Sequence, residues 1–289
     1  MNNPLVSIAV PVYNGGQWLS ATLDSILAQT YTHFELVICD NASDDETPEI
    51  CRQYAKKDAR VRFFENERNI GAALNFNRAF ELSSGTYFKW ASSNDLISPC
   101  YLEKCVPILD ANDDVVVAFT KTQIINESDE VTELYPEELT LEQSSAYDRF
   151  RKFVDNVQLN NVEQGLMRRD VLAQTSLQEV YPNSDTVLMS EMAARGKFIQ
   201  IDEHLLSRRF AESSTTNLLS EEEVAAFYSP GKSHIPMQTF RMFLSFLKIA
   251  FRVPVSTTER LKFLGFAGKF LYWNLGDVAA DLKSLITQK

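Results

Sequence analysis

The stretch FELVICDNASDDET, residues 34–47, decides the fold class. Its first seven residues are mostly apolar, as in a strand of a parallel sheet that is buried on both faces. The strand ends among three aspartates, Asp40, Asp44 and Asp45, and a helix start follows, with Pro48 at the first helical position. A buried strand, an acidic loop and a helix in this order indicate an α/β sheet.

The same alternation continues outward from this stretch. Apolar runs predict further strands at residues 6–12, 61–66 and 86–91, with amphipathic helices between them. Later apolar runs predict a hairpin or paired strands at 115–120 and 122–126, and two separate strands at 197–201 and 204–210. We therefore expect an α/β fold with a mainly parallel central sheet flanked by helices and a helical C-terminal extension.

Charge and hydrophobicity divide the chain into two expected domains. Residues 1–220 hold the strands and helices, with an acidic, helix-leaning insertion at about 128–162, and residues 221–289 are helical. Residues 232–289 carry nine Lys/Arg and three Asp/Glu, a net +6, so the formal charge of −11 leaves −17 on residues 1–231. The change of sign supports the division.

Composition also restricts the class of protein. An acidic body repels nucleic-acid phosphates, so no nucleic-acid partner is expected. The four cysteines show no C-x-x-C spacing and are expected to be reduced, structural thiols. The N-terminus has neither a positive lead nor a long apolar core, and no run approaches the roughly 18 apolar residues that cross a bilayer. A cytoplasmic protein is expected.

Polar clusters follow three of the predicted strands: PVYNGG, CDNASDD and SSND. Parallel strands share a direction, so all three clusters should converge on the carboxyl edge of the sheet. Neither a G-x-G-x-x-G fingerprint nor a P-loop lysine is present. Carboxylates at this edge suggest instead a divalent cation that bridges an aspartate to a diphosphate, with Asp40 or Asp44 contacting the base or ribose of a nucleotide.

Five segments in this order resemble the inverting family 2 glycosyltransferases, which have the GT-A nucleotide-sugar-binding fold. They are VSIAVPVYNGGQWLSATLDSILAQTY, FELVICDNASDDET, NERNIGAALNFNRAF, GTYFKWASSNDLISPCYLEK and NSDTVLMSEMAARG, within residues 4–210. The resemblance implies that the loop after residue 40 holds the nucleoside, usually uridine, with Asp40 at the base. It also implies that Pro11, Tyr13 and Asn14 line the same pocket.

SSND occupies the place of the family's D-x-D element. Ser93 replaces the first acid and Asp95 remains, while Ser93 and Asn94 are expected to contact the donor. One carboxylate, two phosphates and water can complete an oxygen shell around Mg²⁺ or Mn²⁺, so a divalent cation is expected at Asp95. The alternative is that Asp95 is a turn residue before a capped helix.

Asp185 aligns with the acid that serves as the family's catalytic base. Inversion requires a carboxylate on the face opposite the leaving diphosphate, where it takes the proton of the acceptor hydroxyl. The usual Glu before the base is Ser184 here. The alternative is that NSD simply caps the following helix.

Three arginines are candidates for the diphosphate. Arg208 matches an Arg that touches the donor diphosphate or metal in many relatives, although Phe210 stands where His often lies. Arg209 or Arg68 could also offset the charge of the phosphates. The alternative for Arg208 and Arg209 is that they are basic residues on an exposed strand.

The C-terminal segment offers a membrane contact. Aromatic and aliphatic residues alternate there with basic ones: Phe240, Met242, Phe243, Phe246, Leu247 and Phe251 with Arg241, Lys248 and Arg252. Such helices bind anionic headgroups, which suits a lipid-linked acceptor. The alternative is packing on the catalytic domain or on a second subunit, a homodimer.

The predicted activity is transfer of a sugar, from a UDP-sugar or another nucleotide-diphosphate sugar, to a glycan or lipid-linked acceptor. The setting implied by the resemblance is bacterial surface polysaccharide assembly. Two alternatives stay open: a nucleotidyltransferase-like enzyme that releases pyrophosphate, and a non-catalytic binding protein descended from a transferase, suggested by Ser93, Ser184 and Phe210.

Overall fold

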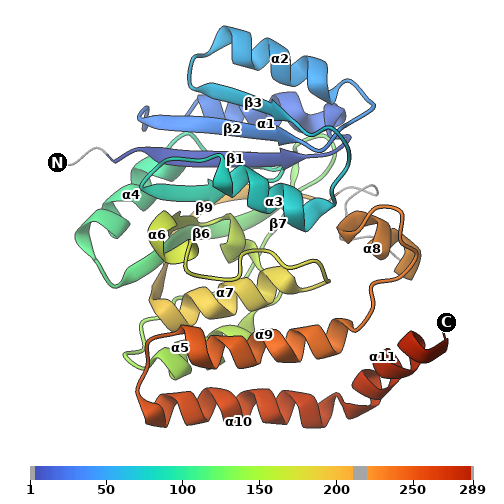
Figure 1. Ribbon diagram of the computed structural model, residues 1–289. Helices are drawn as coiled ribbons and strands as arrows, with labels where there is room; N and C mark the ends of the chain where they lie inside the picture. The colour runs from blue at the N-terminus through green and yellow to red at the C-terminus, as the bar shows by residue number, and fades with distance from the viewer. Residues whose placement is uncertain (1–3, 211–219, 288–289) are drawn as a thin grey trace.

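The computed structural model describes residues 4–210 and 220–287, with side chains to residue 281 (Figure 1). A mixed sheet crosses the middle of the molecule, and helices cover both of its faces. In this part of the chain the sheet has nine strands, eight of them in the order β3-β2-β1-β4-β8-β6-β9-β5, and β7 pairs with β6 outside this path. The expected α/β fold with a helical C-terminal region is confirmed.

The first half of the chain alternates strands and helices. Its strands are β1 (Val6–Val12), β2 (Phe34–Asp40), β3 (Val61–Glu65), β4 (Tyr87–Trp90) and β5 (Leu96–Ile97). Its helices are α1 (Gly16–Leu27), α2 (Thr47–Lys57), α3 (Ala72–Glu81) and α4 (Tyr101–Ala111). The ladders β1–β2, β1–β4 and β2–β3 are all parallel, so these carboxyl ends share one edge.

The second half is less regular. It contains β6 (Val115–Ile125), β7 (Val131–Leu134), α5 (Ala146–Asn156), the 3₁₀ turn η1 (Asn161–Gln164), β8 (Leu166–Arg168), α6 (Arg169–Leu172), α7 (Ser184–Arg195) and β9 (Lys197–Arg209). The C-terminal helices are α8 (Glu221–Tyr228), α9 (Gln238–Arg252), α10 (Thr257–Trp273) and α11 (Leu275–Thr287). Here β6 and β9 run parallel, whereas β8 is antiparallel to both β4 and β6.

β1 explains why the sheet has two cores. Alternate residues of a strand point to opposite faces. Ile8 and Val10 join the cluster under α1, α2 and α4, while Ala9 joins the cluster under α3 and α7. All seven residues of β1 are buried, as expected for a strand covered on both sides.

Two predicted strand pairs are each a single strand. The expected hairpin at 115–126 is one 11-residue strand, β6, and the two strands expected at 197–210 are one 13-residue strand, β9. The polar residues that suggested a break lie where the β6–β9 register shifts, around Thr120, Lys121 and Thr122. Bulges carry the strands past these residues without ending the ladder.

The insertion expected at 128–162 is not mainly helical. Only Ala146–Asn156 is α-helical, and β7 and irregular backbone precede it. Leu139 and Leu141 are fully buried there and pack in the same cluster as Phe153 and Phe198. This segment therefore fills the core beside the sheet. The domain boundary expected at residue 220 adjoins residues 211–219, which lie outside the described residues, and it stays a prediction.

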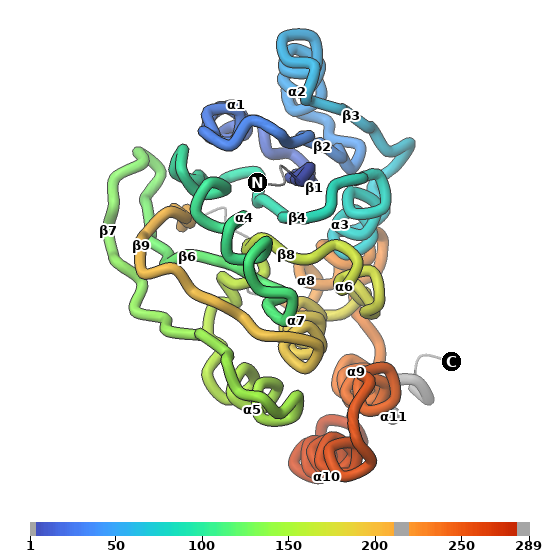
Figure 2. The backbone as a smooth tube through the Cα atoms, turned by 90° about the vertical axis from the view of Figure 1, so that its left-hand side faces the viewer, coloured from blue at the N-terminus to red at the C-terminus, as the bar shows by residue number. Residues whose placement is uncertain are grey.

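The apolar stripe of α9 is mainly core. Phe246 is buried against Phe150 of α5, and Met242, Phe243 and Leu247 pack on the same cluster, while Phe251 is exposed. Figures 1 and 2 place α9, α10 and α11 together at the end of the molecule opposite α2. Packing within the chain therefore accounts for most of this stripe. No described helix combines the length and apolarity needed to cross a membrane.

Candidate active site

The loops after β1 and β2 are bound to each other. The backbone N–H groups of Asn14, Gly15 and Gly16 donate to side chains of the β2 loop: Ser43 Oγ at 2.8 Å, Thr47 Oγ1 at 2.9 Å and Asp45 Oδ2 at 3.0 Å. In return, Asn14 Oδ1 accepts from the N–H of Asp44 at 3.1 Å. Asn14 adopts a positive φ of 49°, which short polar residues tolerate best. The two loops therefore form one unit.

Asp40 lies at the base of this unit. It ends β2 opposite Val12 and is fully buried, and its carboxylate accepts from the backbone N–H and the hydroxyl of Ser43. Burial raises the pKa of Asp40, and the Ser43 hydrogen bonds oppose this rise. Among the other predicted nucleoside contacts, Pro11 is buried within β1, and Tyr13 and Asp44 are exposed beside it.

An asparagine network joins the β3–α3 loop to the same edge. Asn41 donates to Asn69 at 2.8 Å, and Asn66 donates to Asn41 at 2.9 Å and to Asn75 at 3.0 Å. The Asn69 side chain also accepts from the N–H of Gly71 at 2.9 Å. Asn69 therefore satisfies a backbone N–H of this loop. Arg68 lies on the exposed surface of this loop.

Gly71 starts α3 in a conformation that favours glycine. Its φ is +88°, and a Cβ there would lie 2.3 Å from the carbonyl oxygen of Tyr228 in α8. Gly71 therefore allows a tight entry to this helix. The close approach also places α8 beside the carboxyl edge of the sheet (Figure 1).

The β4 loop meets the β1 loop at Ser93. The Ser93 side chain lies so near Gly15 that a Cβ on Gly15 would be 3.1 Å from Ser93 Oγ. Asp95 lies deeper, with 5% of its surface exposed. Its Oδ2 accepts from Gln164 Nε2 at 2.6 Å, and its Oδ1 accepts from the backbone N–H of Arg209 at 2.8 Å. The neighbouring Asn94 is half-buried, and its carbonyl accepts from Arg209 Nε.

Asp185 lies in the first turn of α7, where the helix dipole favours a carboxylate. Its Oδ2 accepts from Asn160 Nδ2 at 2.8 Å. Asp185 is half-buried, and the preceding Ser184 is buried and donates to Gln178 at 3.1 Å. Ser184 is therefore occupied within the protein core rather than at the site.

A second carboxyl group, Glu163, interacts electrostatically with Asp185. The Glu163 carboxyl accepts from Gln178 Nε2. Burial and the nearby Asp185 charge raise its pKa well above the usual range, although the Arg208 guanidinium opposes this rise. Burial, Asp185 and Glu163 also raise the pKa of Tyr228. The phenol and the two carboxyl groups therefore share one environment.

The two arginines at the end of β9 point to different places. Arg208 donates to the carbonyl of Leu159 at 2.7 Å and to Asn161 Oδ1 at 2.8 Å, so it supports the turn that holds Asp185. Arg209 is buried, donates to Asn94 and Asn126 carbonyls and pairs with Asp129. Arg209 therefore acts as a structural support under the β4 loop.

Asn160 and Glu163 were not predicted as site residues, and the contact of Gln164 with Asp95 was not predicted either. No local pattern marks these residues, because their contacts are to Asp185 and Asp95, 25 and 69 positions away. Tyr228 was also missed, since it comes from the helical C-terminal region.

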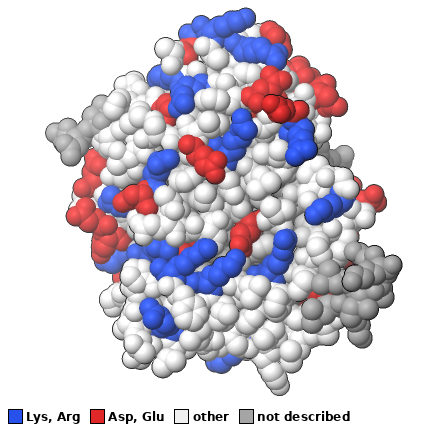
Figure 3. Space-filling view, in the orientation of Figure 1, with Lys and Arg blue, Asp and Glu red and all other residues white. Residues whose placement is uncertain are grey.

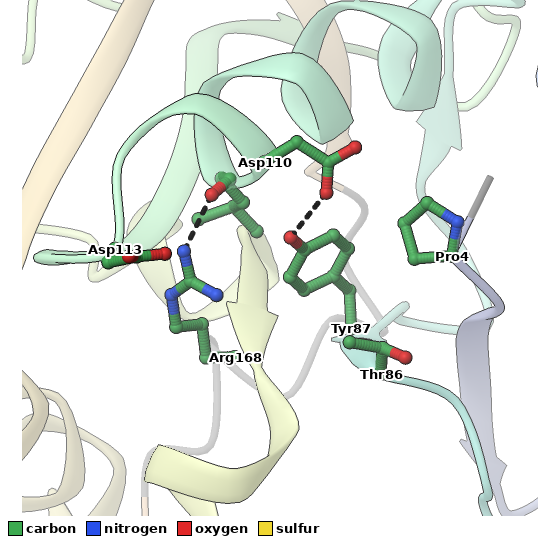
Figure 4. Close-up of a pocket in the computed structure, with 7 residues that line it drawn as sticks. Pro4, Thr86, Tyr87, Asp110, Asp113 and Arg168 are labelled. Carbon is green, nitrogen blue, oxygen red and sulfur yellow. Dashed lines mark hydrogen bonds between the residues drawn. The ribbon is translucent and has the colours of Figure 1, made fainter. Parts of the chain in front are cut away.

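The opposite edge of the sheet carries a hollow of ≈ 490 Å³ (Figure 4). Tyr87 donates to Asp110 at 2.7 Å there, and Arg168 donates to the carbonyls of Leu109 at 2.6 Å and Val115 at 2.8 Å. Its polar groups thus bind one another and cap the end of α4. This hollow therefore has a structural explanation, and the candidate site remains at the carboxyl edge.

Comparison with known proteins identifies the family of the chain. The family model described as Glycosyl transferase family 2 matches residues 7–175. The chain is 39% identical over 101 residues to the putative teichuronic acid biosynthesis glycosyltransferase TuaG of Bacillus subtilis. The aligned residues make up 35% of this chain and 40% of TuaG. The chain spans about half or less of the length of the curated relatives it matches first.

Solved structures show the same fold. S. aureus TarS 1–349 in complex with UDP-GlcNAc aligns with a TM-score of 0.64 at 16% identity, over 92% of this chain and 72% of TarS. The mannosyltransferase PcManGT from Pyrobaculum calidifontis, in complex with GDP-Man and Mn²⁺, aligns with a TM-score of 0.59 at 17% identity, over 100% of this chain and 77% of PcManGT. With the family model matched over more than half of its length, the chain belongs to glycosyltransferase family 2.

Proposed function

We propose that the chain transfers a sugar from a nucleotide-diphosphate sugar to a hydroxyl of a glycan or lipid-linked acceptor, with inversion at the anomeric carbon. One observation carries the proposal: a single turn, Asn160–Gln164, contacts Asp185 on one side and Asp95 of the β4 loop on the other. A carboxylate suited to be a base therefore lies near the loops suited to hold a donor.

The donor half of the proposal uses the loops at the strand ends. Asp40, Tyr13 and Asn14, with Pro11 and Asp44, would hold the nucleoside, and Ser93 and Asn94 would contact the sugar or ribose. Arg68 is on the same side and is exposed, which suits a phosphate contact. Arg208 stays a candidate, although it already supports the turn below Asp185. UDP is the first choice of nucleotide, since TarS was solved with UDP-GlcNAc.

The acceptor half performs the proton transfer. Asp185 takes the proton of the acceptor hydroxyl while its oxygen bonds to the anomeric carbon, and the bond to the diphosphate breaks on the opposite face. An α-linked donor then gives a β-linked product. The nucleoside diphosphate leaves with the electron pair of the broken bond.

A divalent cation, Mg²⁺ or Mn²⁺, belongs to the proposal as an ion carried mainly by the diphosphate. Within the described residues no group of three or more His, Cys, Asp or Glu forms a metal cage. Asp95 fits a phosphate-carried ion, because each carboxylate oxygen keeps a second acceptor position beside its one hydrogen bond. Such an ion would offset the charge of the departing diphosphate.

The outer face of α10 suits a bilayer surface. Leu261, Tyr272 and Trp273 are exposed there, together with Lys262 and Lys269. Figure 3 shows that the lower part of the molecule, over α9 and α10, is mostly uncharged apart from Lys and Arg. Aromatic and basic residues on one helix face match anionic headgroups, so we place the enzyme at the cytoplasmic side of a membrane.

Vesicle sedimentation tests this contact. The protein should sediment with vesicles of about 30:70 anionic to zwitterionic lipid, which is roughly the anionic content of a cell membrane. The double change Trp273→Ser and Lys269→Ser should abolish this sedimentation with vesicles. Self-association that the same two changes abolish, without vesicle binding, would assign the face to a homodimer instead.

The setting proposed is assembly of a bacterial surface polysaccharide, as the name of TuaG suggests. The division into a catalytic domain, residues 1–220, and a helical extension, residues 221–289, is part of the same proposal.

Calorimetry with UDP- and GDP-sugars, with and without Mn²⁺, tests the activity. We expect one nucleotide-sugar to bind and nucleoside diphosphate to be released when an acceptor glycan is added. Asp185→Asn should bind the donor but turn it over about 10²–10⁴-fold more slowly. Pyrophosphate release from a nucleoside triphosphate would indicate a nucleotidyltransferase, and absence of nucleotide binding would indicate a protein without this activity.

A further inference from the structure

The turn between α5 and β8 places two amides against the two acids of the site. Asn160 Nδ2 donates to Asp185 Oδ2 at 2.8 Å, and four residues later Gln164 Nε2 donates to Asp95 Oδ2 at 2.6 Å. Asn160 is 6% exposed and Gln164 is 8% exposed. Each acid therefore has one buried amide of the same short segment as its partner.

The orientation of both amides follows from the chemistry of their partners. An ionised carboxylate only accepts hydrogen bonds, so the NH₂ group must face it and the amide oxygen must point away. In both residues that oxygen is buried, and within the described part of the chain it has no hydrogen-bond partner. Leaving a buried acceptor unpaired is costly. Both side chains therefore keep their hydrogen bonds to the acids although their own amide oxygens are left unpaired.

The turn itself is held rigidly. Asn160 has a positive φ of 51°, which asparagine tolerates better than most residues. The carbonyl of Gln164 accepts from Tyr101 Oη at 3.0 Å and from the buried Lys89 Nζ. The next residue, Gly165, is so enclosed that a Cβ would lie 2.7 Å from Val117. The spacing between the two amides is therefore rigid.

We propose that Asn160 and Gln164 are paired positioning residues, which hold the base Asp185 and the donor-side acid Asp95 in a fixed relation through one rigid turn. This inference rests on the proposed function. It goes beyond it by assigning separate tasks to the two amides: Asn160 acts on proton transfer and Gln164 acts on donor binding.

Two variants separate these tasks. Asn160→Gly removes the amide while relieving the positive φ, and Gln164→Met removes the amide while keeping most of the side-chain volume. Asn183→Gly is the matched control, because Asn183 also has a positive φ, 64°, is exposed, and makes no side-chain cap bond to α7. All variants should be compared by kcat, donor KM, UDP Kd and thermal unfolding.

Asn160→Gly should lower kcat about 10- to 100-fold and leave UDP Kd unchanged, since a charge-assisted hydrogen bond is worth about 1.5–3 kcal/mol. Gln164→Met should raise donor KM and UDP Kd by a similar factor and leave kcat at saturating donor unchanged. Asn183→Gly should match the parent protein.

Parallel changes of kcat and UDP Kd in both variants would show a merely structural turn and overturn the inference, as would two variants with parent-like kinetics. Failure of the proposed function looks different. In that case Asp185→Asn itself would keep full turnover, whatever Asn160→Gly and Gln164→Met do.

Discussion

The donor half and the acceptor half of the candidate site are built in different ways. The donor half consists of three loops at the ends of neighbouring parallel strands, β1, β2 and β4. The acceptor half combines η1, the first turn of α7, the end of β9 and the last turn of α8. Topology alone places the first set at one edge. The second set meets only through tertiary contacts.

The two halves also differ in the kind of interactions that their residues make. The donor loops are joined by hydrogen bonds between backbone N–H groups and short polar side chains. The acceptor half has a cluster of ionisable groups, Asp185, Glu163 and Tyr228, in which burial and mutual repulsion raise the pKa of Glu163 and Tyr228. Clustered groups with raised pKa values are typical of sites of proton transfer, whereas rigid polar loops are typical of ligand binding.

The largest expected effect tests the acceptor half. Asp185→Asn should lower kcat by about 10²–10⁴-fold, because an amide cannot take the proton of the acceptor hydroxyl. UDP binding measured by calorimetry should be unchanged. Full turnover in this variant would contradict the assignment of the base.

A smaller effect is expected in the donor half. Asp40→Asn should weaken UDP binding about 10- to 100-fold, since hydrogen bonds of a buried charged group are worth about 1.5–3 kcal/mol. At saturating donor, kcat should fall much less than in Asp185→Asn. If Asp40→Asn lowered kcat as much as Asp185→Asn and left UDP Kd unchanged, the assignment of Asp40 to donor binding would be contradicted.

Gly71→Ala tests the contact between α3 and α8 that joins the halves. A Cβ at this positive φ would lie 2.3 Å from Tyr228 O, so the free energy of unfolding should fall by about 1–3 kcal/mol. Urea denaturation measures it. Gly268→Ala in α10, where a Cβ meets nothing within 4 Å, is the control and should stabilise the protein by about 0.5–1 kcal/mol. Equal effects of the two changes would contradict the close contact.

The last expected effect is a pH dependence of stability. The folded protein holds the Glu163 proton above pH 4.5, where the unfolded chain has lost it, so stability falls as pH rises. Glu163→Gln has no such proton. Its free energy of unfolding, relative to that of the parent protein, should therefore rise by about 1.4 kcal/mol per pH unit above pH 4.5. Urea denaturation at several pH values between about 5 and 8, all above 4.5, measures this difference in the free energy of unfolding.

Glu179→Gln is the control for this slope. Burial raises the pKa of Glu179, but hydrogen bonds from Ser245, Lys248 and Tyr181 outweigh this and lower it. Both states are then ionised above pH 5, so no slope is expected between parent and variant. If the stability difference between the parent protein and Glu163→Gln is also independent of pH, Glu163 is ionised in the folded protein.

The sequence predicted the first half of the fold and the place of the donor loops well. Buried runs such as 6–12 and 34–40 have the pattern of parallel strands, and Pro48 marks the start of α2. It failed at β6 and β9, where polar residues within a long strand resembled a break. Bulges and long-range pairing decide such cases, and a local window does not contain them.

What the sequence determined by itself is the set of strand-end loops with Asp40 and Asp95, and the family, because these depend on local pattern and on the shared direction of parallel strands. What only the tertiary structure decided is the partnership of Asn160 with Asp185, of Gln164 with Asp95, and of Glu163 with Asp185. Hydrogen bonds and charge interactions act through space, so residues far apart in the chain acquire their roles only when the fold brings them together.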